Sequence, residues 1–405
     1  MTVTLADVER ARERQDDLSV VKQTPLEHSR SFSDFADADV HLKMEHLQRT
    51  GSFKTRGAYN KIAALADEGE IEQIVAASAG NHAQGVAIAA TKLGMDATIV
   101  MPKSAPQAKV DATRGYGAEV VLHGRNFPAA LERAKEMAED PAVEFIPPYD
   151  DPLVIAGQGT IGMEIHEDLP AVDTVVAPIG GGGLISGVSA ALAELAPDVR
   201  VVGVQAEEAA TVPESLDKGI PTTIDDVDTV ADGIATGGVS DLTFDLIEEH
   251  VDDVVVVSDQ EIATAILLLL QRTKQLVEGA GAASVAAIMS EDLDVSGETV
   301  VPILSGGNLD MTTLQRLLSH ALASNDQLVQ LQVRVNERPG VLQEIATTIA
   351  EYDGNIREVT HERAVGDLDV GEADIIFTVE TGGSQQSTRI KEAIEALGHE
   401  VKRQN

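Results

Sequence analysis

The sequence contains no cysteine among its 405 residues. This absence excludes disulfide bonds, metal sites built from thiolates and a cysteine nucleophile. A long hydrophobic run is also lacking: the longest apolar stretch, 262–270, includes Thr264 and is far shorter than the roughly 20 residues of a membrane-spanning helix. The first residues do not combine a basic region with an apolar one, so we predict no signal peptide, no membrane partner and a cytoplasmic location.

Basic residues are few relative to acidic ones. The chain has 30 Lys and Arg against 67 Asp and Glu, for a formal net charge of −37. Such a surface repels nucleic acid and anionic lipid, so we expect neither as a partner. The acidic residues recur along the whole length, which is typical of a protein adapted to high salt; the alternative is an ordinary acidic cytoplasmic protein.

The most informative segment is a run of four glycines followed by a leucine: Gly180, Gly181, Gly182, Gly183 and Leu184. An apolar strand pattern at 174–179 leads into it, and a helical pattern at 184–195 follows. Bare backbone N–H groups at the positive end of a helix dipole form a seat for a phosphate. The alternative for an isolated glycine run is a flexible turn.

Two further loops share this arrangement, a polar, glycine-containing segment directly after a strand pattern. They are Ser78, Ala79, Gly80, Asn81 and His82 after the apolar run 74–77, and 305–308 after the run 299–304. Ligands bind at the carboxyl ends of strands in open α/β sheets, so the three loops can converge on one small phosphorylated ligand. A helix cap is the alternative for the second loop, and a structural role is the alternative for His82.

A lysine with an unusual setting completes this group. Lys54 follows Ser52, a candidate helix N-cap, and therefore lies in the first turn of a helical pattern that ends before Gly69. A cation there is disfavoured by the helix dipole, and burial lowers its pKa further, which supplies the neutral amine of a Schiff-base lysine. The alternative, true of most such lysines, is a solvated side chain.

Strand and helix patterns alternate through most of the first 320 residues. This alternation predicts an α/β fold with a parallel sheet and helices on both faces. No G-x-G-x-x-G with a later acidic residue follows a strand, and Leu184 and Ile185 replace the Walker lysine and hydroxyl residue, so nucleotide sites are disfavoured. A capping box at Ser258 and Glu261 predicts a helix to about Lys274.

The pattern changes after Asn325 and Asp326, which we interpret as a linker. The remaining chain is predicted to alternate as βαββαβ over about 75 residues, the ferredoxin-like arrangement of a small independent domain. We therefore expect a catalytic domain at 1–324 and a second domain at 327–405.

In combination, these motifs resemble the fold-type II pyridoxal-phosphate enzymes, and most closely the threonine dehydratases, also called threonine ammonia-lyases. The similarity spans residues 15–320 and is carried by 52–58, 78–85, 146–152, 157–160, 178–184 and 305–308. It implies two open, twisted, mostly parallel sheets, with a smaller subdomain at about 50–148 inserted in the larger one. The C-terminal segment is similar to an ACT domain, a module that binds amino-acid effectors.

The resemblance implies a role for each site residue and pyridoxal 5'-phosphate as the cofactor. Lys54 binds the cofactor covalently and then takes the substrate α-proton. The other cofactor contacts implied are the four glycines and Leu184 at the phosphate, Asn81 at the ring 3′-oxygen, and Ser305 at the pyridine nitrogen. Ser78, Ala79, Gly80, Asn81 and His82 hold the substrate carboxylate. No metal is expected.

The implied reaction is β-elimination of L-threonine, and of L-serine, to 2-oxobutanoate or pyruvate and ammonia. Alternatives within the same cofactor class are a serine dehydratase, a serine racemase and a threonine synthase. Racemases carry a second serine at the position of Ala79, so racemisation is disfavoured. A non-catalytic amino-acid sensor is the alternative from another class, and an intact Lys54 argues against it.

The ACT resemblance also implies partners. Isoleucine as the effector would indicate feedback control of isoleucine biosynthesis, whereas another amino acid would fit threonine catabolism. Because ACT domains pair across subunits, we expect a homodimer or homotetramer. The alternative is an ACT domain that serves only in oligomerisation.

Overall fold

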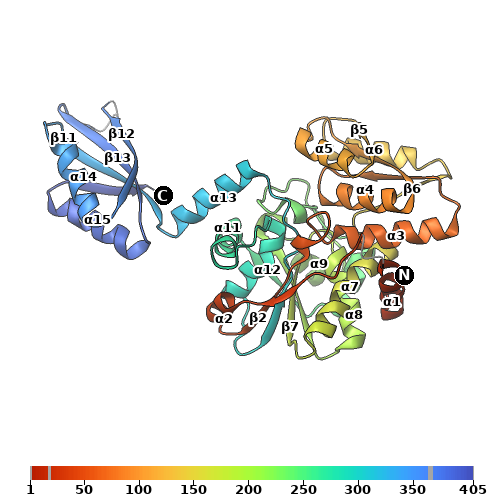
Figure 1. The fold of residues 1–405 in the computed structure, drawn as a ribbon. Helices are drawn as coiled ribbons and strands as arrows, with labels where there is room; N and C mark the ends of the chain where they lie inside the picture. Colours follow the sequence, from red (N-terminus) through yellow and green to blue (C-terminus); the bar gives the residue numbers. More distant parts are fainter. Residues whose placement is uncertain (1, 17–19, 364–367, 405) are drawn as a thin grey trace. The chain divides into compact units, whose positions relative to one another are not determined.

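The computed structural model describes residues 2–16, 20–363 and 368–404. They form two compact units that divide between Asp310 and Met311 (Figure 1). The linker predicted at Asn325 and Asp326 lies fourteen residues beyond this division, after the helix that opens the second unit.

The first unit alternates strands with helices, as the sequence patterns predict. Its strands are β1 (Leu26–His28), β2 (Asp39–Lys43), β3 (Gln73–Ala77), β4 (Asp96–Met101), β5 (Glu119–Leu122), β6 (Val143–Phe145), β7 (Thr174–Pro178), β8 (Arg200–Ala206), β9 (Asp253–Val257) and β10 (Thr299–Pro302). Its helices are α1 (Leu5–Gln15), α2 (Arg30–Ala36), α3 (Lys54–Glu68), α4 (Asn81–Leu93), α5 (Gln107–Gly115), α6 (Phe127–Met137), α7 (Pro152–Asp168), α8 (Gly183–Leu195), α9 (Val212–Lys218), α10 (Asp241–His250), α11 (Asp259–Leu268) and α12 (Gly279–Met289). None of the helices in the described part of the chain has both the length and the hydrophobicity of a membrane-spanning segment.

These strands form two sheets, which confirms the expected fold class. One has the order β1-β2-β10-β7-β8-β9 and is parallel except for the β1–β2 pair; the other has the order β5-β4-β3-β6 and is wholly parallel. Strand β7 is buried at all five positions, as expected for a central parallel strand covered on both faces. The smaller sheet, with α4, α5 and α6, forms a separate lobe of this unit (Figure 1).

One local prediction is wrong. Ser52 does not cap α3: the N-cap is Phe53, whose N–H donates to the carbonyl oxygen of Ser305 at 3.1 Å. Ser52 is instead held in an isolated bridge to Gly306, so pairing between distant segments overrides the local capping preference.

The helix predicted from Ser258 to about Lys274 ends where the sequence predicts but changes its type on the way. Its capping box is present, but α11 ends at Leu268 and the chain continues as a π-helical turn, Leu269–Thr273. Lys274 then takes a left-handed conformation, with φ of 62°. This reversal ends the helix and directs the chain toward α12.

The second unit begins with α13 (Met311–Ser324), and the expected βαββαβ order follows this helix. Its elements are β11 (Leu328–Asn336), α14 (Val341–Glu351), β12 (Asn355–Glu362), β13 (Glu372–Glu380), α15 (Ser384–Ala396) and β14 (Glu400–Gln404). The four strands form an antiparallel sheet of order β12-β13-β11-β14. Alternate residues of β11 and β13 pack with the apolar faces of α14 and α15 in one core.

Candidate active site

The first unit contains a cavity of about 720 Å³ that brings every sequence-predicted site residue together. Its lining includes Lys54, Ser78, Ala79, Gly80, Asn81, His82, Gly180, Gly181, Gly182, Gly183, Leu184 and Ser305. These residues come from four separate parts of the chain, so their meeting in one cavity is a property of the tertiary structure.

The three loops reach the cavity from two sheets, the number that the family resemblance implies. The glycine loop follows β7, and Ser305 lies just beyond β10, both in the six-stranded sheet. The loop 78–82 follows β3 of the smaller sheet. The cavity is therefore lined by strand carboxyl ends from two sheets rather than from one.

The glycine loop is enclosed so tightly that side chains do not fit. A β-carbon on Gly182 would lie 2.8 Å from Cβ of Thr243, and one on Gly181 would overlap the ring of Tyr149. Gly182 also has φ of 88°, in the left-handed region that favours glycine, and serves as the N-cap of α8. The first N–H groups of α8 have no acceptor within the helix, so they are free to bind an anion.

Lys54 is the first residue of α3 and lies on the cavity wall. Its Nζ donates a hydrogen bond to the carbonyl oxygen of Pro148 at 3.2 Å and lies 4.8 Å from the centre of the Phe53 ring. Burial lowers the pKa of Lys54 to about 8, against the opposing effect of the Glu278 carboxylate. A substantial share of this amine is therefore neutral at mildly alkaline pH.

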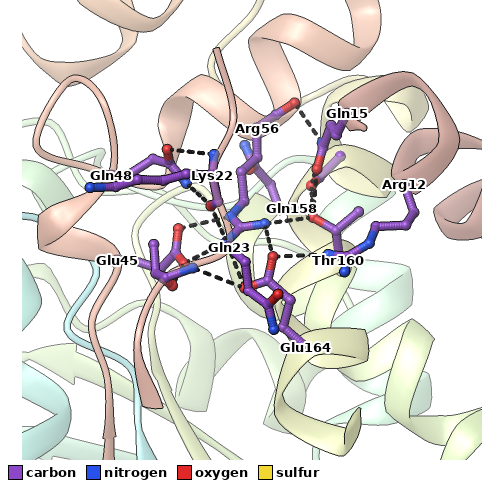
Figure 2. A network of polar contacts seen from close by, with 12 residues as sticks. Arg12, Gln15, Lys22, Gln23, Glu45, Gln48, Arg56, Gln158, Thr160 and Glu164 are labelled. Atoms are coloured by element: carbon purple, nitrogen blue, oxygen red, sulfur yellow. Dashed lines mark hydrogen bonds and ion pairs between the residues drawn. The ribbon is translucent and has the colours of Figure 1, made fainter. Parts of the chain in front are cut away.

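A buried ion cluster anchors the helix that carries Lys54 (Figure 2). The guanidinium of Arg56, which has no exposed surface, makes paired hydrogen bonds of 2.7–2.9 Å to both Glu45 and Glu164. Lys43 donates to Glu164 at 2.6 Å, so two buried cations face two buried carboxylates. Because Arg56 lies two residues after Lys54, this cluster fixes the first turn of α3.

The loop 78–82 combines a backbone turn with a structural histidine. The His82 ring contacts the carbonyl oxygen of Ile146 through Nε2 at 2.8 Å, and burial lowers the pKa of His82 to about 4. The ring is therefore neutral at ordinary pH and donates this hydrogen bond to the backbone. His82 is also one of the residues that line the cavity. Ala79 contributes no hydroxyl to the cavity wall.

Three further residues at this site were not identified from the sequence. Tyr149 packs against the glycine loop, and Thr243 holds that loop by donating to the carbonyl oxygen of Gly181 at 2.8 Å. Glu278, at the start of α12, accepts a 2.7 Å hydrogen bond from Asn81, and burial raises its pKa to about 7. The sequence offered no local signal for Thr243 or Glu278, because their partners are distant in the chain.

Comparison with known protein families gives two matches. Residues 18–306 match the family described as pyridoxal-phosphate dependent enzyme, and residues 329–399 match the ACT domain. The first match covers the cavity and all the predicted site residues, and the second covers most of the antiparallel domain.

Individual relatives agree with these matches. The chain is 45% identical over 400 residues to an L-threonine ammonia-lyase of Thermotoga maritima, covering 99% of each chain. The processed form of threonine deaminase isoform 2 from Solanum lycopersicum superposes with a TM-score of 0.74 at 38% identity, over 78% of this chain and 94% of that one. Maize serine racemase gives the same TM-score at 33% identity, over 80% and 100%.

Proposed function

This chain belongs to the pyridoxal-phosphate-dependent enzyme family, and we propose that it is a threonine ammonia-lyase that also accepts L-serine. The observation that carries the proposal is the placement of Lys54 and the four-glycine loop on the walls of one cavity. A neutral amine and an anion seat are the two features that an aldehyde-bearing phosphate ester requires.

The residues of the cavity fit pyridoxal phosphate. The enclosed glycines at the start of α8 leave their backbone N–H groups available to the phosphate. Thr243 holds the loop in place through its hydrogen bond to the carbonyl oxygen of Gly181. Lys54 supplies the amine for the aldehyde, and Asn81 supplies an amide for the ring 3′-oxygen. Ser305 offers the pyridine nitrogen an uncharged hydroxyl, which does not enforce ring protonation and so favours elimination.

In this proposal the chain's own residues bind the substrate and move one proton. The bound cofactor withdraws electrons from the substrate nitrogen and thereby acidifies the α-carbon. The amine of Lys54 takes the α-proton, and the N–H groups of the loop 78–82 hold the substrate carboxylate. The α-proton and the β-hydroxyl of threonine leave as water, and the released enamine takes up water to give 2-oxobutanoate and ammonia.

Racemisation is the second candidate, since maize serine racemase shares the fold at 33% identity. A racemase needs an acid on the substrate face opposite the lysine. Ala79 lines the cavity without a proton to give. We therefore propose elimination as the principal reaction and expect only slow appearance of D-serine from L-serine, which chiral chromatography measures.

Replacement of Lys54 by alanine tests the function directly. Lys54→Ala is expected to abolish both the visible absorbance of the bound cofactor and the formation of keto acid from threonine. The control is Lys92→Ala, at an exposed position near the end of α4, which should retain both. Retention of absorbance and activity by Lys54→Ala contradicts the proposal.

The second domain supports a proposal about regulation. Because residues 329–399 match the ACT domain, we expect it to bind an amino-acid effector and to pair with a second subunit, giving a homodimer or homotetramer. Threonine deamination measured with and without isoleucine and valine tests the effector. Isoleucine inhibition indicates biosynthetic feedback, whereas no response to either amino acid contradicts feedback control by these two amino acids.

A further inference from the structure

Glu278 occupies a helix-capping position but does not cap its helix. It is the N-cap residue of α12, where a carboxylate would ordinarily accept hydrogen bonds from the first turn, yet its side chain makes none to that turn. The side chain is instead one of the cavity-lining groups and bonds to Asn81, 197 positions away in the sequence. An acid in this place therefore has a role outside α12.

The bond to Asn81 belongs to a chain of hydrogen bonds with a defined direction. Asn308 donates from Nδ2 to the carbonyl oxygen of Thr50 at 2.6 Å and to Oδ1 of Asn81 at 2.8 Å. Asn81 in turn donates from Nδ2 to Oε1 of Glu278 at 2.7 Å. The two ends, a backbone carbonyl and a carboxylate, are both acceptors.

These two ends determine how both amides are oriented. The carbonyl oxygen of Thr50 can only accept, so Asn308 must present its NH₂ group, and Oδ1 of Asn81 must then receive the second N–H. Turning the Asn81 amide over would place its oxygen against Glu278 and its NH₂ against that of Asn308. Both contacts would be repulsive, so the observed orientation is strongly preferred.

The backbone leaves room for this arrangement. A β-carbon on Gly306 would overlap Oε1 of Glu278 and lie 3.2 Å from Nδ2 of Asn81. The N–H of Glu278 also donates to the carbonyl oxygen of Gly306 at 3.0 Å. The glycine after Ser305 thus allows the carboxylate to reach Asn81 and fixes the start of α12 beside it.

We propose that Glu278, together with Asn308, is a positioning residue that fixes the Asn81 amide so that one of its N–H groups is held for the 3′-oxygen of pyridoxal phosphate. The amide of Asn81 has two N–H groups, of which Glu278 takes one. The inference rests on the proposed function, because it assigns Asn81 to that cofactor. It adds two residues that orient the cofactor contact of Asn81.

A double-mutant cycle on cofactor affinity tests this inference. The dissociation constant of pyridoxal phosphate is measured by absorbance with the apo forms of wild type, Glu278→Leu, Asn81→Ala and the double variant. Glu278→Leu is expected to weaken binding about tenfold in the presence of Asn81 and less than about twofold in its absence. Glu278→Gln keeps an acceptor oxygen and should stay close to wild type.

Controls separate positioning from loss of structure. Glu298→Leu removes another half-buried glutamate, which accepts from Thr174 before the start of β10, and should leave the affinity unchanged. If Glu278→Leu does not fold, as judged by its thermal melt, the cycle of Asn308→Ala with Asn81→Ala tests the same hydrogen-bond chain. Asn308→Ala should weaken cofactor binding in the presence of Asn81 and have little effect on the dissociation constant in the Asn81→Ala background.

The outcomes are distinct. Equal effects of Glu278→Leu with and without Asn81, or no effect with Asn81 present, overturn the inference while leaving the proposed function intact. Failure of the wild-type protein to bind pyridoxal phosphate overturns the proposed function itself.

Discussion

Gly57 on α3 and Gly157 on α7 meet backbone to backbone. A β-carbon on Gly157 would lie 2.6 Å from Cα of Gly57 and 2.7 Å from the carbonyl oxygen of Arg56. Two helices approach this closely only where neither carries a side chain at the contact. This contact sets the distance between α3 and α7. Because Lys54 is the first residue of α3, the contact also helps to fix the position of Lys54.

Gly157→Ala should therefore destabilise the protein and weaken cofactor binding. The methyl group forces α3 away from α7, at a cost of about 1–3 kcal/mol in the free energy of unfolding, measured by urea denaturation. The matched control is Gly115→Ala in α5, where a β-carbon meets nothing within 4 Å and the free energy of unfolding should stay equal or rise. Equal stability of the two variants contradicts the prediction.

The pKa of Lys54 predicts how fast the apoprotein captures its cofactor. Since burial lowers this pKa from 10.5 to about 8, the neutral amine accumulates as the pH rises through about 8. The rate of absorbance change after mixing with pyridoxal phosphate should rise toward pH 8 and level off above it, with Lys54→Met as the blank. A midpoint near 10.5 would show that the amine is solvated.

The same pKa shift has a consequence for stability. Between about pH 8 and 10.5 the folded apoprotein binds fewer protons at Lys54 than the unfolded chain does. The Lys54 contribution to the free energy of unfolding should therefore rise with pH across this window. The difference in urea midpoint between wild type and Lys54→Met measures it, and a difference independent of pH speaks against the shift.

The buried ion cluster predicts an asymmetry between two glutamates of α7. Glu164→Gln leaves buried Lys43 and Arg56 facing a single carboxylate, Glu45, and should cost about 3–5 kcal/mol in the free energy of unfolding. Glu167→Gln is the control: its side chain is 49% exposed and it meets Arg12 at 3.5 Å, so its cost should stay below about 1 kcal/mol. If the two variants lose similar free energies of unfolding in urea denaturation, the buried cluster contributes no more to stability than the exposed ion pair does.

The net charge of −37 predicts dependence on salt. Self-repulsion among carboxylates falls as the ionic strength rises and the Debye length shortens, so the melting temperature should increase from dilute buffer to molar KCl. A non-ionic osmolyte at matched osmolality is the control, since it does not screen charge. A melting temperature that responds equally to both additives argues against adaptation to high salt.

Much of the fold could be predicted from local patterns. The strands that end at Pro178 and Pro302 and the βαββαβ order of the second domain follow from hydrophobic periodicity and turn residues, which act over a few positions. Predictions failed where distant segments compete with local preference. Ser52 has the chemistry of a helix cap, but its pairing with Gly306 removes it from that role.

The sequence by itself determined the chemical parts of the site: a lysine at a helix start, bare glycines before a helix, and neutral polar loops after strands. Each depends on residue type and spacing within one short segment. Only the tertiary structure decided that two sheets share one cavity, that Arg56 lies between two carboxylates, and that Glu278 faces Asn81. These relationships join residues far apart in the chain, and no local pattern encodes which distant partner a buried polar group will meet.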